Sequence, residues 1–237
     1  MSIDGIFVSP EASKPMLSLQ EGTLVTGRGL AGDRYHNYVG TYSHIRISKR
    51  HPGEREPGRQ LTLISADSLD AAFEAHNLPK PKSYGDIRRN IVLRGVSSEE
   101  LLAGAGHVVQ LGPTCRVLIH RHCVPCMYNE RKNGIPGMME AIWNESGVSC
   151  EVLVGGSIAV GDVVQILEND KGEVDDGNQP PGYYVPPSKR TTAMVMGSMQ
   201  CLREMKVTLA EIDPEGVERV EASYSTVGLT FWPREMN

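Results

Sequence analysis

The chain has 237 residues with a net charge of −5, and 40% of the residues are hydrophobic. This length suits one large domain or one domain with an appendage, and the acidic balance argues against nucleic acid as a partner. The 25 Gly and 15 Pro indicate many tight turns, which favours a sheet-rich architecture over a helical bundle.

The N-terminus and the cysteines predict a cytoplasmic protein without membrane association. The first residues, MSIDGIFVSPEAS, lack both the basic and the apolar region of a signal peptide. No stretch approaches the roughly 20 apolar residues that a membrane span needs. The five cysteines are an odd number, which argues for a reducing compartment with at least some free thiols.

The first half of the chain predicts strands separated by long turns. We expect strands over residues 3–9 and 16–26, and a long loop over the polar, Pro- and Gly-interrupted residues 40–58. A buried strand over residues 60–64 then leads into a helix, for which Ser65 is a suitable cap.

Later segments follow the same alternation. A short strand over residues 90–94 precedes a capping box, Ser97 to Glu100, for one or two helical turns. Apolar and polar side chains alternate over residues 115–120, which predicts a half-buried strand. About seven to nine short strands, without βαβ alternation in the core, predict a barrel or sandwich.

Composition divides the chain into three parts. Residues 1–168 carry the strand pattern, and the Gly-, Pro- and acid-rich residues 169–187 predict a linker. Residues 188–237 predict a helix and a β-leaning tail with too few apolar groups for a core of their own. We therefore expect this tail to dock on the barrel or on the partner subunit of a homodimer.

The tetrapeptide Cys123-Val-Pro-Cys126 is the most informative motif. A zinc site would need two more ligands, and strand alternation turns His120 and His122 away from Cys123. A thioredoxin-like redox pair would need a βαβ setting, whereas this motif follows a β meander.

The third interpretation is an exposed thiolate at Cys126 that binds a metal or carries sulfur. A free cysteine has a pKa of about 8.5, and nearby groups such as Arg121 and His122 would favour the thiolate. The bland alternative, a buried and inert cysteine, fits Cys115 and Cys150 better because both lie in apolar strands.

Five segments, taken in order, resemble those of the MOSC (molybdenum cofactor sulfurase C-terminal) domain family. They are GRGLAGDRYH (27–36), RQLTLIS (59–65), RRNIVLRGV (88–96), HCVPC (122–126) and GGSIAVGDVV (155–164). Each segment alone is a weak signal, whereas the ordered set is specific and runs through nearly all of residues 1–168.

The resemblance implies an α+β, predominantly β fold, a closed or partly open barrel with a few short helices and a C-terminal extension. It also implies a molybdenum cofactor (molybdopterin), with Cys126 as metal ligand in the reductase branch or as sulfur carrier in the sulfurase branch. Cys123 would orient or shield Cys126. Full-length sulfurases carry an aminotransferase-like domain for which this chain has no room, so no pyridoxal phosphate site is expected.

The resemblance also implies which residues bind the cofactor. Arg88 and Asn90 match an Arg-x-Asn element that approaches the pterin phosphate or the metal pocket. The further candidates are Arg34, Arg59, Gly32 and His36. Arg side chains and backbone N–H groups suit a phosphate-bearing anion. On residue types alone, Gly32 to Arg34 would be an Asp-held turn with a solvated Arg, and one of Arg88 and Arg89 a solvated edge residue.

The leading functional prediction is a molybdenum-dependent reductase of N-hydroxylated compounds, with a small-molecule substrate and an external electron-donor protein. One alternative is a sulfurtransferase that carries a Cys126 persulfide received from a sulfur-donor enzyme. Another is a non-catalytic carrier of the cofactor. A scaffold does not by itself fix the chemistry, so the three stay open at the level of sequence.

Overall fold

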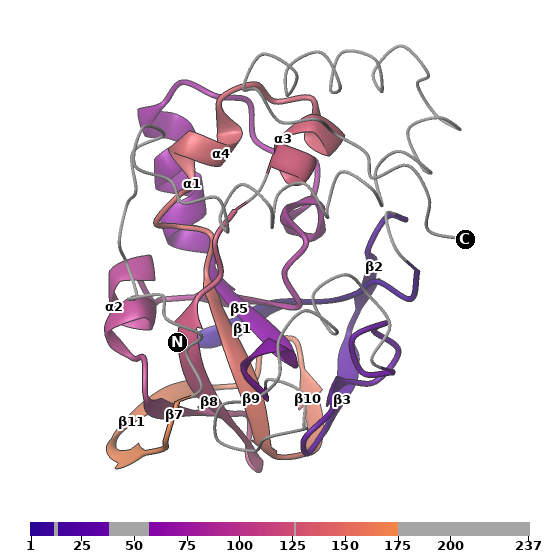
Figure 1. Cartoon of the computed structure of the whole chain (residues 1–237), viewed down its shortest axis with the longest axis vertical. Helices are drawn as coiled ribbons and strands as arrows, with labels where there is room; N and C mark the ends of the chain where they lie inside the picture. The colour runs from indigo at the N-terminus through magenta and orange to yellow at the C-terminus, as the bar shows by residue number, and fades with distance from the viewer. Residues whose placement is uncertain (12–13, 38–56, 126, 175–237) are drawn as a thin grey trace, which may run out of the picture.

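The computed structural model describes residues 1–11, 14–37, 57–125 and 127–174. The predicted tail 188–237, nearly all of the predicted loop 40–58 and Cys126 lie outside these residues. The described chain is mostly β, with a curled eight-stranded sheet, a three-stranded sheet and a few short helices (Figure 1). The predicted α+β, partly open barrel is confirmed.

The elements are as follows in chain order. The strands are β1 (Ser2–Val8), β2 (Leu17–Leu19), β3 (Glu21–Val25), β4 (Gly29–Leu30), β5 (Leu61–Ser65), β6 (Ile91–Arg94), β7 (His107–Leu111), β8 (Cys115–His122), β9 (Val148–Val154), β10 (Gly156–Ala159) and β11 (Val164–Lys171). The helices are η2 (Pro57–Arg59), α1 (Ala66–Ala75), η3 (Tyr84–Ile87), α2 (Ser98–Ala103), α3 (Met127–Asn133) and α4 (Met138–Ala141).

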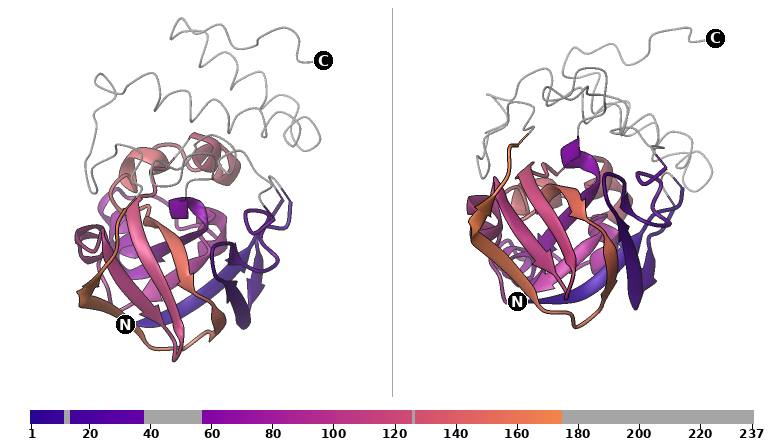
Figure 2. Two further views of the ribbon diagram at one scale, coloured as in Figure 1. Left: turned by 60° about the horizontal axis from the view of Figure 1, so that its bottom comes forward. Right: turned by 90° about the horizontal axis from the view of Figure 1, so that it is seen from below.

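The larger sheet has the strand order β11–β7–β8–β9–β5–β6–β1–β2, and the smaller sheet has the order β10–β3–β4. The larger sheet curls around an apolar interior (Figure 2), filled by side chains such as Ile6, Leu63, Ile91, Val117 and Val152. Helices α1, α3 and α4 gather at one end of the molecule, above the sheets in Figure 1. Among the described residues, no helix has the length and apolar character to cross a bilayer.

One β–α–β crossover departs from the expected pattern. Strands β5 and β6 pair in parallel, and α1 connects them. The helix begins where the sequence predicts, because the Ser65 side chain accepts a hydrogen bond from the Ser68 N–H. Leu69 and Phe73 of α1 are buried against the sheet. The capping box of Ser97 and Glu100 is also present, at the start of α2.

Strand β8 is buried on both faces except at Arg116, which corrects the predicted half-buried strand. Leu118 lies against Gly172, which follows β11, and the His120 ring lies against Gly58 of η2. Alternation of apolar and polar residues along a strand predicts one solvent-exposed face, but segments distant in sequence cover that face of β8. Strand β11 likewise continues to Lys171, beyond the predicted domain boundary at residue 168.

Candidate functional site

Cys126, the predicted catalytic residue and metal ligand, lies outside the described residues, so the site is built from the segments around it. Cys123 directly follows β8 and is half-buried. Its N–H donates to the Gly147 carbonyl at 2.8 Å. Its carbonyl accepts from Ser146 Oγ at 2.7 Å and from Arg89 Nη2 at 3.1 Å. Both backbone polar groups of Cys123 are therefore held.

A second network joins the end of β1, the start of β6 and the loop after β4. The Asp33 carboxylate accepts from the backbone N–H groups of Ser9 at 2.8 Å and Tyr35 at 2.9 Å. It also accepts from Asn90 Nδ2 at 3.2 Å. Asn90 Oδ1 in turn accepts from the Thr62 hydroxyl at 3.0 Å. Asn90 therefore fixes the loop that carries Arg34 to the strands of the larger sheet.

Arg88 connects this network to the start of β6. It caps η3 with a left-handed backbone, φ 62° and ψ 44°, a conformation that costs a non-glycine residue about 1–2 kcal/mol. Its Nη1 donates to the Lys14 carbonyl at 2.8 Å and its Nη2 to Ser9 Oγ at 2.9 Å. The two adjacent arginines thus serve different segments, since Arg88 binds near Ser9 while Arg89 binds the Cys123 carbonyl.

The loop after β4 carries three of the predicted cofactor-binding residues. The Arg34 side chain is 8% exposed, which excludes the solvated interpretation, and its Nε has no hydrogen-bond partner among the described residues. His36 Nδ1 is also buried and, within the described chain, unpartnered. Gly32 has φ +86°, and no described atom lies within 4 Å of the position that a Cβ would take. This loop therefore combines buried polar nitrogens with open space.

Arg59, the remaining predicted residue, ends η2. Its neighbour Gly58 packs on the His120 ring, and the carbonyl of its other neighbour, Gln60, lies directly against Gly29. Gln60 N–H also donates to the Cys150 carbonyl of β9 at 3.1 Å. The Arg59 segment thus touches β4, the strand that leads into the loop of Arg34, through the Gly29–Gln60 contact.

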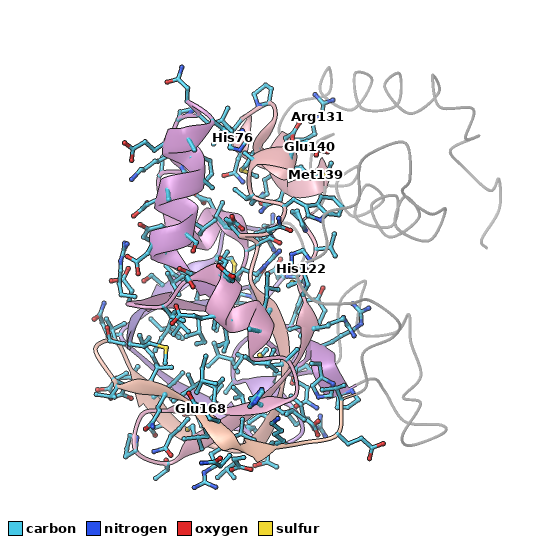
Figure 3. The ribbon with its side chains drawn as sticks, turned by 90° about the vertical axis from the view of Figure 1, so that its left-hand side faces the viewer. His76, His122, Arg131, Met139, Glu140 and Glu168 are labelled. Atoms are coloured by element: carbon cyan, nitrogen blue, oxygen red, sulfur yellow. The ribbon has the colours of Figure 1, made fainter. Side chains whose placement is uncertain are left out.

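His122 is the last residue of β8 and is buried below α3 and α4, whose Arg131, Met139 and Glu140 are labelled with it in Figure 3. Its Nε2 lies 3.0 Å from Ser146 Oγ. Burial, and to a smaller extent the charge of Arg89, lowers the pKa of His122 from 6.5 to about 4. His122 is therefore neutral near pH 7, and the prediction that it favours a Cys126 thiolate by its charge is wrong.

The low pKa of His122 predicts an acid-sensitive fold. The unfolded chain binds a proton at His122 below pH 6.5, whereas the folded chain does so only near pH 4, so stability is lost as the pH falls through this window. His122 alone should lower the free energy of unfolding by about 2 kcal/mol between pH 7 and pH 5. Urea unfolding at both pH values should show a smaller decrease for His122→Gln. An equal decrease in both proteins would contradict this.

The structure also shows where Cys115 and Cys150 lie and bears on the zinc interpretation. Cys115 and Cys150 are buried, and burial raises the pKa of both thiols, as expected of inert residues. Within the described ranges, no three His, Cys, Asp or Glu side chains are grouped as a metal site would require. Sequence reasoning missed Ser9 and Ser146, and no local pattern around these serines singles them out.

Comparison with known proteins supports the fold and assigns the family. Residues 48–165 match the family model described as the MOSC domain. The YuaD protein from Bacillus subtilis has a similar structure, with 15% identity, a TM-score of 0.56, and coverage of 70% of this chain and 94% of YuaD. YiiM from Geobacillus stearothermophilus has 13% identity and a TM-score of 0.50, with coverage of 91% and 98%.

A search of curated proteins finds no significant match. The structural similarities, at these low identities, establish the fold alone. The match of the family model spans β5 to β10 and includes the Arg88–Asn90 element and both cysteines of the Cys123–Cys126 motif. The chain belongs to the MOSC domain family, a family linked to the molybdenum cofactor.

Proposed function

We propose that this protein binds a molybdenum cofactor with Cys126 as thiolate ligand and reduces N-hydroxylated compounds. The observation that carries the proposal is the junction at Arg88 and Arg89. One arginine binds Ser9, next to the loop of Arg34, and the other binds the Cys123 carbonyl, three residues before Cys126. The two halves of the predicted site, distant in sequence, are thereby linked at the start of β6.

The described residues fit a phosphate-bearing ligand. Arg34 Nε and His36 Nδ1 are buried polar atoms without a described partner, and Gly32 of the same loop has no described atom within 4 Å of the position that a Cβ would take. Positive charge is also concentrated here. Burial, together with the charges of Arg88 and Lys14, lowers the pKa of Lys132 on α3, and Asp86 offsets this only in part. An anion that binds beside these groups would relieve both the repulsion and the unsatisfied hydrogen bonds.

The residues would divide the work as follows. Arg34 and Arg88 would bind the anionic group, Asn90 and Asp33 would hold the loop in place, and Cys126 would supply the soft thiolate that suits molybdenum. When bound, the cofactor would supply removal of the oxygen atom from the substrate, which leaves as water at the cost of two electrons from an external donor and two protons. Arg89, a buried cation beside the Cys123 carbonyl, would favour an anion in the segment that follows.

Metal and sulfur analysis of the anaerobically purified full chain tests the proposal. Bound molybdenum together with reduction of an N-hydroxylated test compound supports it. A persulfide on Cys126 in a protein without metal would favour the sulfurtransferase alternative. Bound cofactor without turnover in the presence of a chemical electron donor would favour the carrier. A purified chain that never binds molybdopterin, even when the cofactor is supplied in excess, overturns both cofactor-dependent functions.

Arg88→Ala should reduce cofactor retention more than it reduces thermal stability. A charge-assisted phosphate contact contributes about 1.5–3 kcal/mol, which corresponds to roughly tenfold to a hundredfold weaker binding. Arg88→Gly is the matched control, because glycine removes the same guanidinium but relieves the left-handed backbone. Both variants should lose molybdopterin equally although Arg88→Gly melts at the higher temperature. Wild-type cofactor content in either variant would remove Arg88 from the site.

A further inference from the structure

Arg89 is a buried cation that is bound by backbone carbonyls. Its Nε donates to the Ser146 carbonyl at 2.7 Å, and its Nη2 donates to the Cys123 carbonyl at 3.1 Å. Its Nη1 lies 3.4 Å from the carbonyls of Ile87 and Arg88. These contacts use the planar fork of the guanidinium in several directions at once, which a lysine cannot reproduce. Arg89 thus joins the start of β6 to Cys123, just after β8, and to Ser146, just before β9.

Ser146 donates a hydrogen bond to the same carbonyl. This serine is fully buried just before β9, and its Oγ donates to the Cys123 carbonyl at 2.7 Å. The hydroxyl also lies 3.0 Å from His122 Nε2 and 3.1 Å from the Trp143 carbonyl, and we assign its single proton to the Cys123 carbonyl because that contact is the shortest of the three. Two donors from separate parts of the sequence therefore converge on one oxygen atom, at the point where β8 ends.

The end of β8 needs such support because the strand pairing stops there. Cys123 N–H makes the last bond, to the Gly147 carbonyl, and Pro125 has no N–H with which to continue a ladder. Without other contacts, a chain that leaves a sheet in this way has several accessible directions. Contacts to the Cys123 carbonyl restrict the peptide plane between Cys123 and Val124, and hence the exit direction.

We propose that Arg89 and Ser146 are positioning residues that clamp the Cys123 carbonyl and set the direction in which the chain leaves β8 toward Cys126. The inference rests on the proposed function only for the identity of the reactive thiol. Through Arg89, the clamp also ties this exit to Arg88, which the proposed function places at the cofactor anion. Arg89 and Ser146 need not touch substrate or cofactor to determine whether the thiol is correctly placed.

Hydrogen exchange of the Cys123 amide in the full chain tests the clamp directly. Loss of a donor should let the end of β8 open locally, so Ser146→Ala should accelerate exchange of this amide about tenfold. Arg89→Met should accelerate it further, and Arg89→Lys should restore only part of the protection. Val109→Ala in the core strand β7 is the control, since it lowers the melting temperature without touching the clamp. Its Cys123 amide should exchange at the wild-type rate.

Turnover provides the functional measurement. Ser146→Ala should lower kcat about tenfold with KM unchanged, because a misplaced thiol affects the reaction more than substrate binding. Equal Cys123 exchange in Ser146→Ala, Arg89→Met and Val109→Ala would overturn the clamp, whatever the activity. If Arg89→Met does not fold, Ser146→Ala and Arg89→Lys decide the question. If the Cys123 amide exchanges faster in the clamp variants but the chain never binds molybdenum, the clamp is supported and only the proposed function is overturned.

Discussion

Cys126→Ser should abolish the proposed reduction of N-hydroxylated compounds and leave the fold intact. A serine hydroxyl is a hard, neutral oxygen near pH 7, whereas molybdenum binding or sulfur transfer requires a soft thiolate. The segment before Cys126 is held by contacts of other residues, including the backbone hydrogen bonds of Cys123. Activity should fall below about a thousandth of wild type, while the melting temperature should change by less than about 3 °C.

Cys123→Ser is the matched control, because it changes the same atom in the same tetrapeptide. The structure holds Cys123 through its backbone N–H and carbonyl, which the substitution keeps, so activity should decrease only a few-fold. Equal losses in the two variants, with a Cys123–Cys126 disulfide formed during turnover, would favour the dithiol redox interpretation. A chemical trap for the disulfide, followed by mass spectrometry of the tryptic peptide, distinguishes the two cases.

Local signals in the sequence predicted much of the fold. The Ser65 cap and the Ser97–Glu100 capping box each depend on residues within one helical turn, and both are present. The β-rich barrel followed from the density of turn residues and from the family motifs. Strands β2 and β4 have only three and two residues, and runs of that length carry no readable alternation.

The departures from prediction all involve contacts between distant segments. The pattern of β8 predicts a polar face, but Gly172 and Gly58 cover Leu118 and His120, and nothing within residues 115–120 records this. The parallel pairing of β5 with β6 also depends on tertiary packing. His122 looked like a cation beside the thiol, but burial and Arg89 make it neutral. The pKa of such a side chain depends on its burial, which cannot be read from the sequence.

In the candidate site, too, the sequence predicted local features but not the contacts between distant segments. The family resemblance predicted Arg88 and Asn90 as one element of the site, whereas the different contacts of Arg88 and Arg89 depend on the left-handed backbone of Arg88. The role of Ser146 depends on a turn that brings it to the Cys123 carbonyl, 23 residues away in sequence. Gly29 and Gly32 both have a positive φ, but the space around the two glycines differs.

Gly29→Ala, in strand β4, should destabilise the protein more than Gly32→Ala in the loop that follows the strand. Gly29 has φ +103°, and a Cβ at this position would overlap the Gln60 carbonyl oxygen, which is backbone and cannot rotate away. The strain of the positive φ adds to the overlap. Together they should destabilise the protein by about 4 kcal/mol, or roughly 10 °C in melting temperature.

Gly32→Ala is the matched substitution for this test. Its φ of +86° imposes similar backbone strain, but no described atom lies within 4 Å of the new Cβ, so the expected cost is only about 1–2 kcal/mol. The methyl group would instead occupy open space in the loop that carries Arg34, where we propose that the cofactor anion binds. Gly32→Ala should therefore lose more molybdopterin than its small stability loss explains, whereas Gly29→Ala should lose cofactor only as the protein unfolds.

Thermal melts and cofactor content measured on the same preparations separate the two effects. Equal destabilisation by both substitutions would show that backbone strain dominates and that the Gly29–Gln60 contact adds nothing. Unchanged cofactor content in a folded Gly32→Ala protein would place the anion elsewhere.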